Sequence, residues 1–266
     1  MSARTRLSQA AVEQRRQAVL RRVAEAGEVA IADLAEQFDV SLMTMHRDLD
    51  NLAERHMLRK RRGRAVAYPM LTMETATRFR EGVNTAEKTA LCEAAVTYIE
   101  PGATVIVDDS STVYPLAGAL ARAGIETLTV ITNSLGVAHR MAREAPRVEV
   151  ALLGGRYCAE FDSCTGPEVT RGLARTRADL LLMSATAVLQ GRLYHPMRDV
   201  AEIKEAMLGS AAHAMLLLDH TKFGKTATYL HGTTGAFGTV ITDAAAPVDE
   251  MAALRATGAR VDVIDV

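Results

Sequence analysis

The sequence has no tryptophan, only 4% aromatic residues and just 3 cysteines in 266 residues. The cysteines, Cys92, Cys158 and Cys164, form no Cys-x-x-Cys pair, and their odd number argues against a disulfide framework. No apolar run approaches the ~18 residues that a membrane helix needs. The N-terminal residues also lack the apolar segment of a secretory signal. We therefore expect a cytoplasmic protein without a membrane partner.

An excess of charge of one sign is also missing, because 31 Lys and Arg nearly balance 32 Asp and Glu. The charges are nevertheless unevenly distributed. Residues 1–64 hold 13 cationic and 9 acidic side chains, whereas the remaining residues hold 18 and 23. A basic N-terminal part favours contact with phosphates, and an acidic remainder does not. With 48% hydrophobic and 24% charged residues, the chain is typical of soluble globular proteins of one or two domains.

The N-terminal part has the spacing of a helix-turn-helix. A first helix over 7–26, with its arginine pairs facing solvent, is predicted to end at Gly27, because glycine adopts a left-handed C-cap without strain. A short helix over 32–37 and a turn at 38–40 follow. A further helix begins at Ser41, whose hydroxyl can accept a backbone N–H. In that helix four apolar residues recur at helical spacing and are expected to share a buried face: Leu42, Met45, Leu49 and Leu52.

The opposite face of the helix that begins at Ser41 is small, polar and partly cationic. It presents Met43, Thr44, His46, Arg47 and Asp50, and a recognition helix meets base edges in the major groove at its N-terminal end. Arg47 is the first candidate for a base contact, since an arginine can donate to guanine O6 and N7 together. The pattern predicts that this end of the helix binds double-stranded DNA.

Residues 57–68 read as two short strands joined by a turn at Gly63, which is the wing of a winged helix-turn-helix. Five of the six residues from Arg59 to Arg64 are cationic. On such a hairpin Arg61, Arg62 and Arg64 are expected to neutralise DNA phosphates. A solvated basic loop is the alternative, but the position directly behind a recognition helix favours the wing.

The pattern changes after the wing. Residues 69–83 show no strand alternation and only weak helical character, so we expect them to link a DNA-binding domain (1–68) to a second domain (84–266). In the second domain seven apolar runs read as buried strands: 104–107, 127–131, 148–152, 180–183, 214–218, 239–241 and 260–264. Helical segments accompany them at 85–99, 113–122, 135–143, 168–175, 200–212 and 248–256. This alternation predicts an α/β fold with a mostly parallel sheet covered on both faces.

Small polar residues follow several of these strands. In open α/β sheets, ligands bind beyond the carboxyl ends of the strands, often at helix N-termini. Hydroxyls and backbone N–H groups there suit an anion, which favours a phosphorylated small molecule. Helix capping uses the same residue types in any α/β protein and is the alternative. The candidates are Asp108, Ser110, Ser111 and Thr112 after the first strand, Thr132, Asn133 and Ser134 after the second, and Gly154 and Gly155 after the third.

Asp219 and Lys222 follow the strand predicted at 214–218 and complete the candidate ligand site. Lys222 can pair with a carboxylate or a phosphate, and Asp219 can accept hydrogen bonds from hydroxyls. The alternative is an ordinary surface loop at the end of a strand. No cofactor and no metal site are predicted, because the histidines lack the spacing of metal ligands: His46, His56, His139, His195, His213, His220 and His231.

These motifs resemble the DeoR family of bacterial transcriptional regulators over almost the whole chain. The segment VSLMTMHRDL, from Val40 to Leu49, resembles the family signature VS-x-x-T-[IV]-R-R-D-L, and Leu58 and Arg59 continue it. The C-terminal part resembles the family at 108–112, 132–134, 152–155, 200–207 and 219–224. The resemblance implies a winged helix-turn-helix followed by a sensor domain similar in fold to ribose-phosphate isomerase. It also implies a homodimer or homotetramer that represses a carbohydrate-utilisation operon until a phosphorylated sugar or polyol binds.

The chain departs from the family pattern at several positions. His46 stands in place of a usual arginine, and Arg61-Arg62-Gly63 replaces a usual His-Gly-Gly, so we expect a different operator sequence. Asp109 adds a carboxylate beside the expected phosphate site, and Tyr194-His195-Pro196 stands where Leu-Thr-Thr is usual. We therefore expect an effector other than the simple sugar phosphates.

The alternative function is a sugar-phosphate isomerase with an appended DNA-binding head. An isomerase needs a general base beside a lysine or an acid. Asp219 and Lys222 offer fragments of such a site, but the D-G-x-D-E run of ribose-phosphate isomerases is not visible. A regulator that binds its ligand without turnover is therefore predicted, and not an enzyme.

Overall fold

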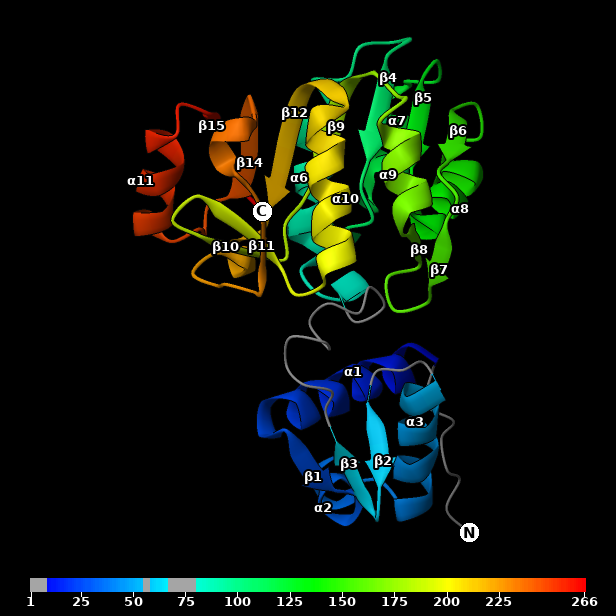
Figure 1. The fold of residues 1–266 in the computed structure, drawn as a ribbon. Coiled ribbons are helices and arrows are strands. Elements are labelled where there is room, and N and C mark those ends of the chain that lie inside the picture. The colour runs from blue at the N-terminus through cyan, green and yellow to red at the C-terminus, as the bar shows by residue number, and fades with distance from the viewer. Residues whose placement is uncertain (1–8, 55–57, 67–79) are drawn as a thin grey trace. The chain divides into compact units, whose positions relative to one another are not determined.

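The computed structural model describes residues 9–54, 58–66 and 80–266. The chain divides into two compact units, Met1–Gly82 and Val83–Val266, and each is described by itself (Figure 1). The linker predicted at 69–83 lies for its larger part outside the described residues.

The N-terminal unit packs helices against a small antiparallel sheet. Its strands pair in the order β1-β3-β2, and Gly27 ends the first helix with a φ of 73°, as predicted. The core of the unit is formed by apolar residues from every helix, including Leu20, Leu34 and Leu49. The elements are α1 (Gln9–Ala26), β1 (Glu28–Ala30), α2 (Ile31–Gln37), α3 (Leu42–Glu54), β2 (Arg59–Arg61) and β3 (Arg64–Val66).

The wing prediction is confirmed by β2 and β3. Arg61 pairs with Arg64, and the two residues between them, Arg62 and Gly63, have φ values of 46° and 78°. Two consecutive positive φ angles are typical of the two-residue turn whose twist matches that of a hairpin. The tip is therefore a tight two-residue turn. Residues 57, 67 and 68 of the predicted wing lie outside the described residues.

Two expectations for the helices of this unit are wrong. Leu42 is 51% exposed, whereas Met45, Leu49 and Leu52 are fully buried. Leu42 is the first residue of α3, at the margin of the apolar stripe, so the core does not reach it. The sequence pattern also predicts that Arg15 and Arg16 face solvent, but both contact α3 instead.

Asp48 explains the position of these arginines. Its side chain is buried on α3, and its two oxygens accept from Nε of Arg15 at 2.7 Å and Nε of Arg16 at 2.9 Å. A buried carboxylate requires such partners, because an unpaired charge is strongly disfavoured away from water. The pair thus joins α1 to the helix that carries the candidate DNA-reading residues.

The C-terminal unit is an α/β domain built on a parallel sheet of seven strands in the order β15-β14-β12-β9-β4-β5-β6. Every pairing within this sheet is parallel, which confirms the predicted fold class. All seven predicted strands are found, with ends shifted by a few residues. They are β4 (Thr104–Val107), β5 (Thr129–Thr132), β6 (Glu149–Leu152), β9 (Ala178–Met183), β12 (Ala211–Leu218), β14 (Thr239–Asp243) and β15 (Arg260–Ile264).

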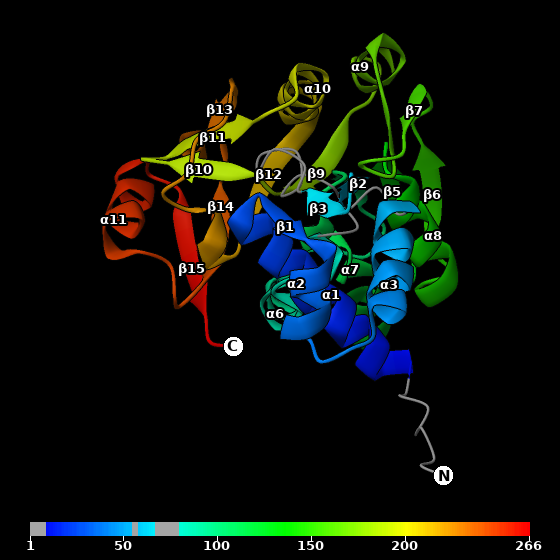
Figure 2. The same cartoon turned by 90° about the horizontal axis from the view of Figure 1, so that it is seen from below.

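Helices cover both faces of this sheet (Figures 1 and 2). Because side chains alternate along a strand, Val105 and Val107 of β4 join one apolar cluster and Ile106 joins the other. The first cluster includes residues of α6 (Thr85–Val96), α7 (Leu116–Ala123) and α8 (Leu135–Glu144). The second includes residues of α9 (Pro167–Leu173), α10 (Arg198–Gly209) and α11 (Val248–Ala256).

The helix predicted over 113–122 is wrong at its start. The structure has a 3-10 turn, η1 (Ser111–Val113), and α7 begins only at Leu116. Pro115 lies between them with a φ of −67°. Proline has no backbone N–H and a fixed φ, so it is suited to begin a helix and not to lie within one.

Several short strands are additional to the predicted sheet. The hairpin of β7 (Arg156–Cys158) and β8 (Ser163–Thr165) follows β6. A second antiparallel sheet consists of β10 (Ala187–Leu189), β11 (Arg192–His195) and β13 (Tyr229–Thr233). These strands have three to five residues, which is too short for a periodic pattern to be read from sequence.

Candidate functional site

The N-terminal end of α3 has the features expected of a recognition helix. Ser41 Oγ accepts the backbone N–H of Thr44 at 3.2 Å and so caps the helix as predicted. Met43 is 66% exposed, Arg47 is exposed and His46 is half-buried. Within the described residues Arg47 has neither an ion pair nor a hydrogen bond of its side chain. Its five N–H donors are therefore available to a partner.

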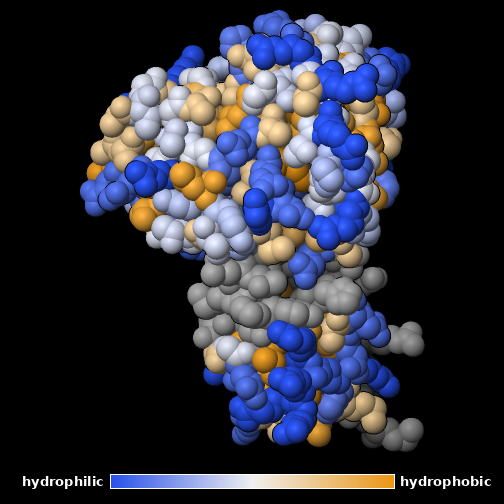
Figure 3. All heavy atoms as spheres, in the orientation of Figure 1, coloured by the Kyte–Doolittle hydropathy of each residue, from blue (hydrophilic) through white to orange (hydrophobic). Residues whose placement is uncertain are grey.

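The wing supplies further cations. Arg61, Arg62 and Arg64 are all exposed. Arg64 forms an ion pair with Glu28 of β1, and both side chains are about half exposed, so part of its charge is already neutralised. The face of this unit seen in Figure 3 is mostly hydrophilic where side chains are described. Arg61 and Arg62 are thus the wing cations best placed to meet phosphates.

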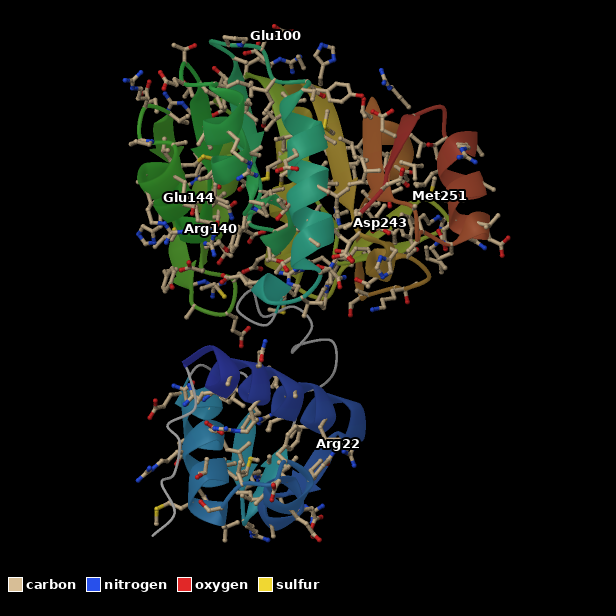
Figure 4. All side chains as sticks on the ribbon, turned by 180° about the vertical axis from the view of Figure 1, so that it is seen from behind. Arg22, Glu100, Arg140, Glu144, Asp243 and Met251 are labelled. Carbon is tan, nitrogen blue, oxygen red and sulfur yellow. The ribbon has the colours of Figure 1, made fainter. Side chains whose placement is uncertain are left out.

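In the C-terminal unit the polar candidates gather where the strand order reverses. The chain fills one half of the sheet as β4, β5 and β6 and the other half from β9 to β15. The switch point lies between β4 and β9, and the residues that follow these strands are Asp108 and Ser184. Ligands of open α/β sheets bind at this position, outside the carboxyl ends of the strands. Figure 4 labels Asp243 at the carboxyl end of β14. It also labels Glu100, which lies at the opposite end of the strands, near their amino ends.

A buried lysine links the loops at the switch point. Lys204 of α10 forms an ion pair with Oδ2 of Asp108, and both side chains are almost fully buried. Its Nζ also donates to Ser110 Oγ at 3.2 Å and to the carbonyl oxygen of Ser184 at 3.1 Å. An ammonium group has three hydrogens, so these contacts use all of them. The backbone N–H of Ser184 donates to the same oxygen of Asp108 at 3.1 Å.

A second cationic group lies along the same edge. Lys88 of α6 is buried, and its Nζ donates to Ser111 Oγ at 3.2 Å. At the end of β12, Asp219 Oδ1 accepts from Asn84 Nδ2 at 2.9 Å, and Asp219 Oδ2 lies 3.6 Å from Lys222 Nζ.

The cations decide the charge of Asp219. Burial raises the pKa of this carboxyl group and is the largest single effect. The charge of Lys222, the hydrogen bonds from Thr221 and Asn84 and the charge of Lys88 lower the pKa and together outweigh burial. The pKa of Asp219 therefore lies below its usual value. The group is a carboxylate at neutral pH, and it balances two lysines that could otherwise hold an anion.

His231 of β13 is buried beside this cluster. Its side chain is 3% exposed, and among the described residues neither ring nitrogen has a hydrogen-bond partner. Burial, followed by the charges of Lys204 and His195, lowers its pKa from 6.5 to about 3. The neutral ring offers one donor and one acceptor. His195 of β11 is also buried, and its Nδ1 accepts the backbone N–H of Met197 at 3.1 Å.

The residues predicted after β5 make the hydrogen bonds of a capped loop. Thr132 Oγ1 accepts from the backbone N–H of Ser134 at 3.0 Å, and Ser134 Oγ accepts from that of Val137 at 3.2 Å. Asn133 Nδ2 donates to the carbonyl oxygen of Cys164 at 2.8 Å. Its Oδ1 is buried without a partner among the described residues and is the free acceptor of this loop.

The predicted glycine pair lies apart from these hydrogen bonds. Gly154 and Gly155 follow β6 at the edge of the sheet, and both are exposed. A Cβ on Gly155 would lie 2.6 Å from the carbonyl oxygen of Thr165 in β8, whereas a Cβ on Gly154 would meet nothing within 4 Å. The close approach at Gly155 is therefore to the protein's own backbone.

The structure thus joins Asp108, Ser110, Ser111 and Thr112 to residues that the sequence reasoning did not select. The hydroxyl of Ser184 donates to Thr112 Oγ1 at 3.2 Å. Lys204 lies in a segment that matches the family pattern, but a lysine on an amphipathic helix normally indicates a solvated face. The residues that were missed are Asn84, Lys88, Ser184, His195, Lys204 and His231.

In the part of the chain that the structure describes, no three His, Cys, Asp or Glu side chains gather as a metal site would require. No described helix is long and apolar enough to cross a bilayer.

A winged helix-turn-helix in one unit and a parallel α/β domain with polar loops at its switch point in the other define a two-domain regulator of transcription. Residues 15–69 match the family model for the DeoR-like helix-turn-helix domain, and residues 83–244 match that for the DeoR C terminal sensor domain. The chain belongs to the DeoR family of transcriptional regulators. This confirms the resemblance seen in the sequence.

Two relatives from Escherichia coli (strain K12) illustrate the similarity. The chain is 33% identical to the HTH-type transcriptional repressor CsqR over 226 residues, which are 85% of each chain. It is 30% identical to the glycerol-3-phosphate regulon repressor over 247 residues, which are 91% of this chain and 94% of that one.

Solved structures give weaker matches. Ribose 5-phosphate isomerase A from Neisseria gonorrhoeae aligns at a TM-score of 0.38 and 14% identity, covering 51% of this chain and 52% of that chain. The translation initiation factor eIF-2B of Pyrococcus horikoshii OT3 aligns at 0.40 and 15% identity, covering 85% and 78%.

Proposed function

We propose that this chain represses a carbohydrate-utilisation operon and that a phosphorylated sugar or polyol, bound to the C-terminal unit, releases it from the operator. The observation that carries the DNA-binding half is the capped end of α3, where Arg47 is exposed and without a partner among the described residues. Relatives named as repressors of the glycerol-3-phosphate regulon and of the aga operon support a carbohydrate pathway and the repressing direction. A relative named as an L-fucose operon activator makes activation the outcome to test against.

The roles of the DNA-binding residues follow from their positions. Arg47 donates to a base, and a bidentate arginine–guanine contact contributes roughly 1–3 kcal/mol of discrimination. Ser41, Met43, Thr44 and His46 line the same helix end. Arg61, Arg62 and Arg64 neutralise phosphates, which contributes to binding of every sequence and to its salt dependence.

The effector site that we propose lies along the carboxyl edge of the sheet. Lys88 and Lys222, together with the Ser111 hydroxyl, would hold the phosphate, since phosphate is bound by ammonium and hydroxyl donors. Binding would separate Lys222 from Asp219, whose ion pair is 3.6 Å long. The buried acceptor Asn133 Oδ1 would meet a hydroxyl of the carbohydrate. The remaining predicted contacts are Asp108, Ser110, Thr112, Thr132, Ser134, Gly154 and Gly155.

The same proposal includes binding without turnover, a homodimer or homotetramer, and action in the cytoplasm. A dimer places two recognition helices on half-sites related by symmetry. The effector shifts the spacing of the heads, and a coupling free energy of ~1–3 kcal/mol per pair of sites is typical of such regulation.

Fluorescence anisotropy of the duplex upstream of the chain's own gene tests the DNA half, at two salt concentrations and with Arg47→Ala. We expect saturable, salt-dependent binding by the wild type and its loss in the variant. If the wild type binds this duplex no better than random duplex, and enriches no sequence from a random library, the regulator proposal is wrong.

A panel of phosphorylated sugars and polyols, with their unphosphorylated counterparts, tests the effector half in the same assay. Lys222→Met should lose the response while DNA binding persists. Lys225→Met, which removes an exposed cation from the same loop, should retain it. Conversion of the effector to an isomer during incubation would contradict binding without turnover.

A further inference from the structure

The wing and the recognition helix are joined by one side chain. Lys60 lies on β2, which runs beside α3 (Figure 1). Its Nζ is 3.2 Å from Nδ1 of His46 and 2.5 Å from Oδ1 of Asp50. His46 and Asp50 are one helical turn apart, so a single ammonium group reaches both. Asp50 holds the ammonium group in place beside the imidazole.

This contact favours one tautomer of the His46 ring. An ammonium group has three donors and no lone pair, so Nδ1 of His46 must be the acceptor. In a neutral imidazole only one nitrogen bears hydrogen, and the acceptor is the other one. Nε2 of His46 is therefore an N–H donor.

The position of His46 on α3 gives that donor a role. The contact with Lys60 is the only hydrogen bond of the His46 ring within the described residues, so Nε2–H has no partner there. His46 lies between Met43 and Arg47, in the half of a recognition helix that contacts base edges. In the major groove, guanine presents two acceptors, O6 and N7, whereas adenine and thymine present one each, N7 and O4, and cytosine presents only a donor.

We propose that Lys60 makes His46 a reader of guanine, with Nε2–H donating to O6 or N7. The inference rests on the proposed DNA-binding function and adds to it the identity of one base and the residue that selects it. Lys60 acts through His46 and is a positioning residue. Its own charge is paired with Asp50, as that of Arg64 is with Glu28, so its direct contribution to phosphate binding is partly neutralised.

Selection of binding sites from a random duplex library tests this assignment. The wild type should prefer guanine at one position of each half-site, in addition to the position read by Arg47. His46→Ala should lose this preference while other positions keep theirs. A neutral hydrogen bond supports a preference between about twofold and tenfold.

The decisive comparison is between two variants that each lose one positive charge from the wing. Lys60→Met and Arg62→Met each remove one cation, so both should weaken binding to all sequences and reduce the salt dependence. Only Lys60→Met should also relax the preference at the His46 position, because Arg62 lies at the exposed tip of the hairpin. Combining Lys60→Met with His46→Ala should relax that position no further than His46→Ala alone.

Nitrogen-15 NMR of the DNA-free protein provides a readout that does not depend on any operator. His46 should show Nε2 protonated and Nδ1 unprotonated in the wild type, and Lys60→Met should lose this tautomeric bias. The opposite tautomer in the wild type would overturn the inference even if DNA binding is intact.

Other outcomes separate this inference from the proposed function. Cytosine at the His46 position, or a preference that Lys60→Met and Arg62→Met leave equally intact, would overturn the role of Lys60 alone. A library without enrichment for any sequence would overturn the proposed function and this inference with it.

Discussion

Lys204 and Asp108 form an ion pair whose side chains are 3% and 1% exposed, at the point where the strand order of the sheet reverses. The pair joins α10 to the loop after β4. Ser110 and Ser184 also donate hydrogen bonds to the Asp108 carboxylate. A buried ion pair is tolerated when its remaining polar atoms are hydrogen-bonded in this way. The loops of the candidate effector site are therefore fixed by a charge pair that itself lies out of solvent.

Removing one partner of this pair should be strongly destabilising. Lys204→Met leaves the Asp108 side chain buried without its ion-pair partner, and we expect a loss of roughly 3–5 kcal/mol in the free energy of unfolding. Adding Asp108→Asn should recover part of that loss, because the unpaired charge is then removed. Arg198→Met breaks an exposed pair with Glu202 on the same helix and serves as the control, with an expected loss below about 1 kcal/mol. Urea unfolding followed by circular dichroism measures all four proteins. Equal losses for Lys204→Met and Arg198→Met would contradict the argument.

Asp48 should matter to the N-terminal unit in a related way. Asp48→Asn would remove the charge that holds Arg15 and Arg16 against α3. We expect a loss of about 2 kcal/mol, less than for a fully buried pair, because the arginine side chains remain 12% and 22% exposed. Glu36→Gln, an exposed site on α2, is the matched control. Thermal unfolding of each variant is the measurement. A melting temperature for Asp48→Asn equal to that of the control would show that the contacts of Asp48 with Arg15 and Arg16 contribute little to stability.

The fold could be read from sequence to the extent that each element carries a local signal. The seven parallel strands are short and rich in apolar residues, and Ser41 and Gly27 mark helix ends by their own chemistry. The hairpin β7–β8 and the sheet of β10, β11 and β13 carry no such signal. Their strands are too short for alternation, and their stability comes from packing on the domain and not from local propensity.

The candidate site could be predicted only in part, because only some of its residues carry a local sequence signal. Residues in the loop after a strand, such as Asp108 and Ser111, reach the carboxyl end of the sheet because of topology, so their sequence position identifies them. Lys204 and His231 reach it from a helix and from an antiparallel strand. Their burial depends on tertiary contacts that no local pattern encodes. A buried lysine looks like a solvated one until its carboxylate partner is known.

His231 should make stability depend on pH. Its pKa is lowered from 6.5 to about 3 in the folded chain, so the unfolded chain binds a proton more readily between these values. The free energy of unfolding therefore falls as the pH drops below the unfolded value of about 6.5, by about 2 kcal/mol between pH 7 and pH 5 from this group. His231→Leu should flatten that part of the profile, and His139→Leu, at an exposed site of α8, should not. Urea unfolding at the two pH values is the measurement. Parallel profiles for the wild type and His231→Leu would show that His231 does not titrate in this way.

Substitution of the two adjacent glycines after β6 distinguishes a role in packing from a role in ligand binding. Neither glycine has a φ in the left-handed region, so alanine is strained at neither by backbone conformation. At Gly155 the new Cβ would lie 2.6 Å from a backbone oxygen of β8, which cannot move without disturbing the hairpin. Gly155→Ala should therefore cost about 1–3 kcal/mol, as overpacking does. Gly154→Ala meets open space and should be neutral or stabilising by up to about 1 kcal/mol.

The response of DNA binding to the effector completes this comparison. If Gly154 allowed a ligand to approach the backbone, as its place after a strand predicts, Gly154→Ala would weaken the response in a protein of undiminished stability. A normal response in Gly154→Ala, with instability confined to Gly155→Ala, would assign the glycine pair to the β6–β8 contact and remove both residues from the effector site. Because the two substitutions add the same methyl group one residue apart, the difference between them isolates the contact with Thr165 from any general effect of losing a glycine.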